Sequence, residues 1–565
     1  MKNIRYIIAA IAGVLVFGSC SLDETNYMEI EKTKYMKTAA EAETVLLGVY
    51  HNMVSDPMYG YHMSLYFTLG TDEAKVEGSS LNSWRALPNN SYSPTESQVQ
   101  QSWAALYNAI YDANDFIEGL SVAVESYTSD SEKNLAAIYM AEARALRAQF
   151  YFELVRWYGN VVLMKTTEES EKHPSTFVQS SPEEVYEFIE QDLLYAIDIL
   201  PYASDDTYRS NNAFRLSKGS VLGLLTKVYA TWAGYPVQDE SKWQKAASTA
   251  KILVESGKHG LLEDFEQLWK NTCNSVWDPT ESLMEVSFYA PVSTGSDPTG
   301  RIGKWNGTTA ADGTGDYIRI AANWKVIPTF LSNWKDYDKD RRWAISFADY
   351  KYTKNGKEPL MTYKLEGSSE KINGTFADAM ASDAKPDMRK PYNNALTPAK
   401  WDLNKYADSH FADANFSNVN WYLLRYSDVL LLYAEALNEW HKAPTTEAYA
   451  AVNMVRRRAF GLPVNVASSV ADLPTGLSYE AFQQAVQDER SYELCFEGHR
   501  RQDLVRWGKY YEAIMQTASD IIEWHEQMPS LYLIADHTVK GKHELLPIPQ
   551  RDLDLMPLCN QNPNW

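Results

Sequence analysis

An apolar stripe runs unbroken through residues 132–158 and limits the fold to packed helices. Apolar side chains recur there at alternating steps of three and four residues, which is the period of one face of an α-helix. The members of this stripe are Ile138, Ala141, Ala145, Ala148, Phe152 and Val155. Several of them are alanines, whose small side chains let a second helix approach closely. The stripe therefore predicts a long helix that lies directly against another.

Two further blocks extend the pattern. Residues 217–233 carry apolar side chains on two adjoining faces, so the predicted helix is sandwiched between neighbours. The first face holds Leu222, Leu225, Tyr229 and Trp232, and the second holds Val221, Leu224 and Val228. Residues 421–440 repeat a single stripe through Tyr426, Leu430, Tyr433, Leu437 and Trp440. Paired helices separated by turns predict stacked helical hairpins of tetratricopeptide type.

Boundary signals agree with this helical interpretation. Thr38 is followed three residues later by Glu41, and Ser181 by Glu184, which is the spacing of a capping box. Pro182 stands at the first helical position of the second helix, where proline is favoured. Three glycines follow helical runs and are expected to end them: Gly159, Gly234 and Gly461.

Two long segments, near residues 55–100 and 290–420, interrupt the helical blocks. They are rich in Gly, Ser, Asn, Asp, Pro and Thr, and tryptophan and tyrosine are scattered through them. The chain holds 17 Trp, 37 Tyr and 18 Phe, so most of its aromatic rings carry a polar edge that suits contact with a polar ligand. Loops this long are usually functional in a compact protein. We therefore expect the ligand to bind at these segments.

The charge of the chain excludes one class of partner. Its 565 residues carry a formal net charge of −21, which repels phosphate backbones and argues against sequence-independent binding of nucleic acid. An apolar content of 45% is typical of a globular protein and excludes general disorder.

The N-terminus has the pattern of an exported lipoprotein. Lys2 and Arg5 precede an apolar stretch over residues 6–17, which is too short to span a membrane and has the length of a signal-peptide core. Small residues precede Cys20, as in the lipobox of bacterial lipoproteins, although Phe17 replaces the usual leucine. We therefore predict a signal peptide over 1–19, lipidation at Cys20 and a tether over 20–36. A plain signal peptide with an incidental cysteine is the alternative.

The remaining cysteines predict no metal centre and no disulfide framework. Cys273, Cys495 and Cys559 are few, odd in number and far apart. Buried thiols with at most one bridge are expected, and which pair would bridge is left open. No later stretch is long and apolar enough to span a bilayer, so the expected contact with the membrane is through the N-terminal lipid only.

Motifs that resemble catalytic or metal sites fail on inspection. His543-Glu544 begins like a zinc-protease motif but has no second histidine, and Asp336, Asp338 and Asp340 lack the glycine and the final glutamate of a calcium loop. Glu489, Glu493 and Glu497 recur every fourth residue, with Arg501 continuing the row, so they are interpreted as one charged helical face. The sequence predicts no enzyme, no cofactor and no metal.

Several segments resemble one family closely. They are AEARALRAQFYFEL (141–154), RLSKG (215–219), LRYSDVLLLYAEA (424–436), ERSYELCFEGHRRQDLVRWG (489–508), LPIP (546–549) and QNP (561–563). In this order they are similar to the signature segments of the SusD/RagB outer-membrane lipoproteins of Bacteroidota. Asp23 and Glu24 behind Cys20 also resemble the surface-export signal of such lipoproteins.

The resemblance implies a fold and a role. The expected fold is dominated by α-helices, with four tetratricopeptide-like helix pairs, a large irregular loop-rich ligand face and minor β structure, in a single domain over 37–565. The family implies a SusC-type TonB-dependent transporter as partner, with the chain anchored by lipid in the outer membrane and facing the cell exterior. It also implies non-catalytic capture of glycan oligomers for import.

A glycan site needs aromatic faces for the sugar rings and planar polar groups for their hydroxyls. Family ligands tend to lie in the two loop regions, so the expected site residues are Asp72, Trp84, Arg85, Asn89, Asn90, Tyr92, Tyr289, Trp305, Asn306 and Tyr317. Trp324, Trp334 and Trp343 are instead assigned to packing. Neither the sugar nor its linkage follows from the sequence. A peptide-capturing, RagB-like lid of a TonB-dependent transporter is the alternative, and a helical-repeat adaptor without a ligand is a third possibility.

Overall fold

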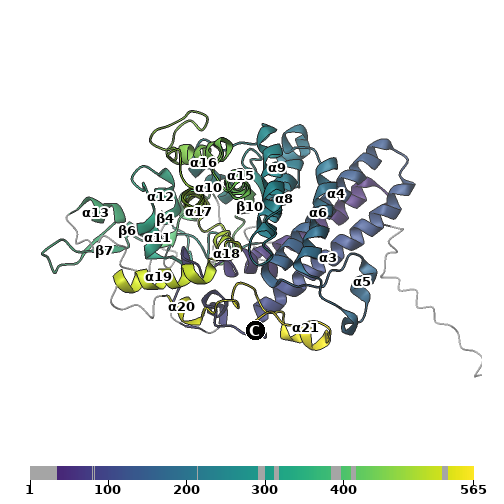
Figure 1. Ribbon diagram of the computed structural model, residues 1–565, viewed down its shortest axis with the longest axis horizontal. Coiled ribbons are helices and arrows are strands. Elements are labelled where there is room, and N and C mark those ends of the chain that lie inside the picture. Colours follow the sequence, from purple (N-terminus) through teal and green to yellow (C-terminus); the bar gives the residue numbers. More distant parts are fainter. Residues whose placement is uncertain are drawn as a thin grey trace, which may run out of the picture.

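The two longest helices lie on one side of the molecule, and the short strands between residues 347 and 374 lie on the other (Figure 1). The computed structural model describes residues 35–78, 80–81, 83–212, 214–289, 299–310, 317–382, 396–408, 415–524 and 532–565. The predicted signal peptide over 1–19, the lipidation residue Cys20 and nearly all of the tether over 20–36 lie outside the described residues.

The helical scaffold is built from helices of 13 to 29 residues. They are α2 (Ala39–His51), α3 (Ser97–Ala123), α4 (Asp130–Tyr158), α6 (Pro182–Ile199), α8 (Lys218–Ala233), α9 (Lys242–Glu255), α15 (Tyr426–His441), α16 (Thr446–Ala459), α17 (Tyr479–Leu494) and α19 (Tyr510–Trp524). Shorter helices are α5 (Thr167–Glu171), α7 (Thr207–Asn211), α10 (Phe265–Cys273), α11 (Pro328–Asn333), α12 (Arg341–Ser346), α13 (Phe376–Ala381), α14 (Leu403–Tyr406), α18 (Arg500–Arg506), α20 (Ile534–His537) and α21 (Gln550–Leu555).

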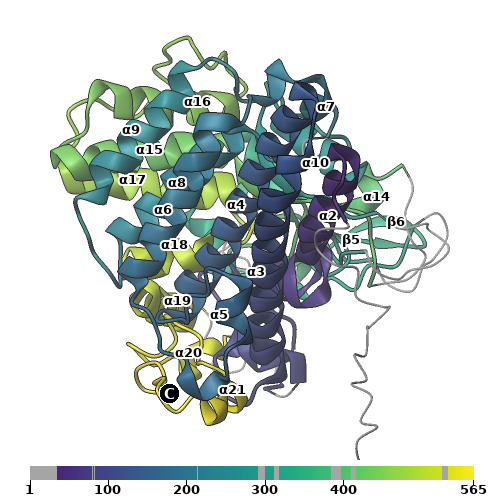
Figure 2. The same cartoon turned by 90° about the vertical axis from the view of Figure 1, so that its right-hand side faces the viewer.

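Successive long helices contact one another in chain order. Helix α3 packs on α4, α4 on α6, α6 on α8, α8 on α9, α9 on α15, and α15 on α16 and α17 (Figure 2). Helix α4 is buried from Ala136 to Tyr158, apart from a few half-buried positions such as Ile138, and α8 is buried on both predicted faces. The all-α scaffold predicted from the sequence is confirmed.

The predicted helix boundaries are also confirmed. The Thr38 side chain accepts a hydrogen bond from the Glu41 backbone N–H, and Ser181 and Glu184 form a reciprocal capping box. Gly159 ends α4 with φ of 70°, a backbone conformation that glycine adopts without strain. Gly234 follows α8 directly.

The β structure consists, within the described residues, of antiparallel strand pairs. They are β1 (Ala74–Val76) with β3 (Trp324–Val326), β2 (Ser282–Val286) with β10 (Trp421–Arg425), β4 (Phe347–Ala348) with β9 (Thr397–Pro398), β5 (Tyr350–Thr353) with β6 (Gly356–Pro359), and β7 (Met361–Tyr363) with β8 (Ile372–Gly374). The helix expected over 421–440 was therefore placed too early, because its first five residues form β10. Pairing with β2 satisfies their backbone groups, and tryptophan and tyrosine favour a strand.

A buried cluster of ion pairs joins the helical scaffold to the irregular side. Glu493 lies within 2.6 Å of Arg458, 2.9 Å of Arg425 and 3.0 Å of Arg342. Arg425 also binds Glu281 at 2.7 Å. Because each carboxylate meets several guanidinium groups, the charges compensate one another without water. The glutamate row of α17 is therefore scaffold.

Two details of that row differ from the sequence prediction. Helix α17 ends at Leu494, and Phe496 adopts φ of 66°, so Glu497 and Arg501 do not lie on one helix. Glu497 binds Arg425 at 2.7 Å instead. The prediction of one continuous helical face is therefore wrong for Glu497 and Arg501, because the helix ends before them.

The remaining comparisons with the sequence concern the cysteines, metal ligands, membrane spans and three tryptophans. Cys273, Cys495 and Cys559 are all free thiols. In the part of the chain that the structure describes, no group of three potential ligand side chains could hold a metal ion, and no helix is long and apolar enough to cross a membrane. Trp324 and Trp334 are buried, and Trp343 packs against Phe347, as predicted.

Candidate ligand-binding site

The two polar loop regions meet in a cluster of three aromatic rings. The ring centroids of Trp84 and Trp305 lie 5.1 Å apart with an interplanar angle of 78°, and those of Trp305 and Tyr61 lie 4.6 Å apart at 61°. We call Tyr61, Trp305 and Trp84 the aromatic row. Trp84 and Trp305 are half-buried, so each ring both packs and faces outward. Two predicted ligand residues that are distant in sequence thus become neighbours in space.

The pairing of β1 with β3, which are far apart in the sequence, brings the residues of the row together. The two strands pair with Val76 opposite Trp324, and the Trp324 backbone N–H donates to the Trp305 carbonyl at 3.0 Å. On the other side, the Arg85 guanidinium donates to the Glu77 carbonyl at 2.7 Å, directly after β1. The row is therefore positioned by strands at the base of both loops, as a precise binding site requires.

Two arginines flank the row. The Arg85 guanidinium carbon lies 4.0 Å from the centre of the Trp84 ring, and that of Arg301 lies 4.7 Å from the centre of the Tyr61 ring. Asp56 binds Arg301 at 2.6 Å and is more than one-third exposed. Burial raises the pKa of Tyr61 above its usual range, so this phenol stays neutral. Aromatic faces beside planar donors and a carboxylate can bind a ring whose edge carries hydroxyls.

Several predicted site residues are buried away from solvent. The Asn89 amide donates to the Arg85 carbonyl at 3.0 Å, and Asn306 accepts from the Gly303 N–H at 2.7 Å. Asn90 donates to Tyr510 and Thr538, and Tyr92 packs on Trp565 with ring centroids 4.9 Å apart. The structure therefore gives these four side chains a role in shaping the loops.

The other predicted residues lie outside the aromatic row. Asp72 forms a two-pronged ion pair with Arg500 at 2.6 and 2.8 Å. Tyr317 packs on Tyr352, with ring centroids 4.7 Å apart. Tyr289 is 72% exposed and lines a separate pocket.

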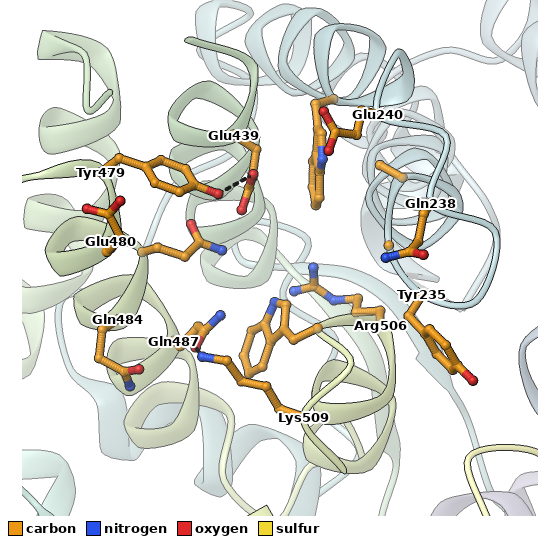
Figure 3. A pocket seen from close by; sticks show the side chains of 15 residues that line it. Tyr235, Gln238, Glu240, Glu439, Tyr479, Glu480, Gln484, Gln487, Arg506 and Lys509 are labelled. Atoms are coloured by element: carbon orange, nitrogen blue, oxygen red, sulfur yellow. Dashed lines mark hydrogen bonds between the residues drawn. The ribbon is translucent and has the colours of Figure 1, made fainter. Parts of the chain in front are cut away.

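A polar pocket of about 410 Å³ lies on the helical side, between the helix ends of α8, α15 and α17 (Figure 3). Several of its polar groups are already bonded: Tyr479 donates to Glu439 at 2.7 Å, and Lys509 donates to Gln487 at 2.6 Å. Arg506 points its guanidinium at Glu435 at 2.6 Å. The pocket also presents the exposed carboxylates of Glu240 and Glu480, so its lining is polar and acidic.

Tyr61, Asp56 and Arg301 were not selected from the sequence. Tyr61 falls within the 55–100 loop region but among several other aromatic residues, and Arg301 follows residues 290–298, which are not described. Only the spatial contact between the loops distinguishes these three side chains. Two runs of consecutive arginines, 456–458 and 500–501, serve the scaffold. Arg456 binds Glu489 at 3.0 Å, Arg457 binds Asp472 at 2.6 Å, and Arg501 donates to carbonyl oxygens.

Comparison with known proteins identifies the family to which this chain is similar. Residues 305–565 match the family described as SusD family, and residues 22–230 match one described as starch-binding associating with outer membrane. A solved SusD homologue from Bacteroides thetaiotaomicron is 56% identical, with 95% of this chain and 99% of the other covered and a TM-score of 0.88.

More distant relatives share the same architecture. A solved laminarin binding SusD-like protein is 24% identical, covers 93% of this chain and 99% of its own, and has a TM-score of 0.65. SusD-like protein P2 of Formosa agariphila is 26% identical over 513 residues, which is 89% of this chain and 90% of the relative. The chain belongs to the SusD/RagB family of nutrient-binding proteins, and its helical scaffold with an irregular loop face is the SusD-like fold.

Proposed function

We propose that this protein captures glycan oligomers at the aromatic row and passes them to a SusC-type TonB-dependent transporter, without catalysing a reaction. The observation that carries the proposal is the meeting of Trp84 and Trp305 beside Arg85. Relatives whose names state binding of laminarin and of surface glycans support carbohydrate as the ligand class.

The chemistry of the aromatic row suits sugar rings. A pyranose has apolar C–H faces that stack on indole and phenol rings, while its hydroxyls bind planar donors and acceptors at the edge. Arg85, Arg301 and Asp56 supply such groups beside the rings. An open row encloses little of its ligand, so we expect modest affinity and ready release.

Capture without chemistry is supported by the state of the carboxylates. The glutamates of α17 are buried against arginines and so cannot flank a substrate as an acid and base pair must. Asp56 and Asp72 are each paired with an arginine. Neither the α17 glutamates nor these two aspartates are arranged as a catalytic acid beside a base.

Anchoring and partnership complete the proposal. Lipid on Cys20 would hold the chain at the outer membrane with its loop face toward the exterior, and the body would act as a lid on the transporter. The family resemblance supports this arrangement.

The test is electrophoresis of the chain from Ser21 onward in native gels that contain a panel of neutral and acidic polysaccharides. We expect retardation in at least one gel, and loss of it in Trp84→Ala and Trp305→Ala. Trp440→Ala is the matched control, because Trp440 is 41% exposed at the end of α15. Unchanged mobility of the wild type in every gel would contradict glycan capture; retardation that survives both row variants would contradict the site.

A further inference from the structure

A second pocket, of about 590 Å³, is walled by aromatic rings. Tyr50, Phe214, Trp277, Phe288 and Tyr289 line it together with Glu285, and we call it the aryl pocket. Ring centroids of Tyr50 and Phe214 lie 6.0 Å apart, and those of Phe214 and Trp277 lie 5.7 Å apart. The rings therefore form a continuous wall.

The wall is held rigidly from behind. Tyr50 donates to the Glu142 carboxylate at 2.6 Å and accepts from the Leu216 N–H at 2.9 Å. Phe288 is fully buried, and its backbone N–H donates to Asn420 at 3.2 Å. Tyr289, the next residue, is exposed by contrast and forms the rim. A rigid wall with an exposed aromatic rim is prepared to receive a flat group without rearranging.

The polar groups of the aryl pocket are few and mostly occupied. Glu285 accepts from Asn420 at 2.7 Å and from Ser282 at 2.8 Å, and burial raises its pKa to about 7. The Trp277 indole N–H has no hydrogen-bond partner in the described part of the chain. His51, Ser275 and Ser287 also line the pocket, and the rest of the lining is apolar or aromatic.

This lining decides which chemistry fits. A sugar ring would lose its water and find few partners for its hydroxyls. An anionic group would also be desolvated next to the Glu285 carboxyl. An uncharged aryl group instead gains contact with the aromatic rings of the lining.

The aryl pocket adjoins the Arg301 end of the aromatic row. Val54 lines the pocket, and Asp56, two residues later, binds Arg301 above the Tyr61 ring. From the other side, a Cβ on Gly300 would lie 3.2 Å from the Phe288 ring, which places the wall directly against the chain that leads into Arg301. The two sites are therefore neighbours in the fold.

We propose that the aryl pocket binds an uncharged aryl group carried as a substituent on the glycan that the aromatic row captures. This inference rests on the proposed function and specifies its substrate class as an aryl-substituted glycan. It also gives a role to Tyr289, the exposed tyrosine that the sequence selected and that lies outside the aromatic row.

The first experiment tests the aryl pocket without any glycan. Methyl ferulate is titrated into the chain from Ser21 onward while binding is followed by calorimetry and by ligand-observed NMR. We expect saturable binding that weakens at least fivefold in Tyr289→Ala and in Trp277→Ala, and that is unchanged in Trp440→Ala. Tyr289→Ala keeps the test valid if Trp277→Ala fails to fold, because the Tyr289 side chain is largely exposed. Absence of saturable binding overturns the proposal.

The second experiment joins the two sites. An oligosaccharide from the retarding polysaccharide is compared with the same oligosaccharide carrying a feruloyl ester. We expect the ester to bind at least fivefold more tightly to the wild type and equally to Tyr289→Ala. If the ester and the unmodified oligosaccharide bind equally well to the wild type, the proposal is overturned while glycan capture stands. If N-acetyl-phenylalaninamide binds and the feruloyl ester gives no gain, the pocket serves peptides and the proposal is also overturned.

Discussion

Replacing Glu493 by glutamine should destabilise the protein strongly without touching the ligand site. The variant keeps the shape of the side chain but removes the negative charge that Arg458, Arg425 and Arg342 share at 2.6, 2.9 and 3.0 Å. Glu493 and these arginines are almost wholly buried, so water cannot replace the lost partner. Breaking a buried ion pair on one side costs about 3–5 kcal/mol, and the sharing of three arginines places the expected loss at that level.

The assay is urea denaturation followed by tryptophan fluorescence, with Glu480→Gln as the matched control. Glu480 lies on the same helix, α17, but is exposed, so its midpoint should stay near that of the wild type. Equal midpoints for the two variants would refute the argument that the buried cluster supports the fold.

The same cluster makes a prediction about acid. Burial alone would raise the pKa of Glu493, but the three arginines outweigh it and hold the pKa well below its usual range. The stabilisation is therefore present above the unfolded-state pKa, near 4.5, and is lost as the pH falls toward the folded-state pKa. Glu493→Gln should show a shallower fall of stability between about pH 5 and pH 2 than the wild type. A fall of equal slope would contradict this assignment.

Three further outcomes follow from single side chains. Lys75 is 6% exposed, lies opposite Lys325 across β1 and β3, and burial lowers its pKa to about 8. Lys75→Met should therefore raise the free energy of unfolding in urea by about 1 kcal/mol; a lower free energy of unfolding would contradict this. Burial raises the pKa of Glu73 from 4.5 to about 8, so this carboxyl lowers the free energy of unfolding more and more as the pH rises between those values. Glu73→Gln should therefore make the free energy of unfolding fall less steeply over that pH range. Tyr92→Phe should leave polysaccharide retardation unchanged, because the Tyr92 ring packs on Trp565; lost retardation would return Tyr92 to the site.

The scaffold could be predicted from hydrophobic periodicity, because the buried face of a helix follows from the spacing of apolar residues within the helix itself. The stripe through 132–158 became α4, and the capping signals at Thr38 and Ser181 fell at true helix starts. The start of α15 was misplaced, because whether Trp421–Arg425 forms a strand depends on β2, about 140 residues earlier.

The candidate site could be located by region but not by residue. Loop composition pointed to Trp84 and Trp305, which do meet, but equally to Asn89 and Asn306, whose amides hold the loop backbone. Asparagine in a polar loop has the same local pattern in both roles. Tyr61 and Arg301 could be recognised only once β1 and β3 brought their segments together.

The most direct test of glycan capture at the aromatic row is a crystal structure with an oligosaccharide from the polysaccharide that retards the protein. The account predicts a sugar ring stacked within about 4 Å of the Trp84 or Trp305 face, with a hydroxyl hydrogen-bonded to Arg85, Arg301 or Asp56. An oligosaccharide bound instead in the polar pocket beside Arg506 and Lys509, with the aromatic row empty, would contradict it.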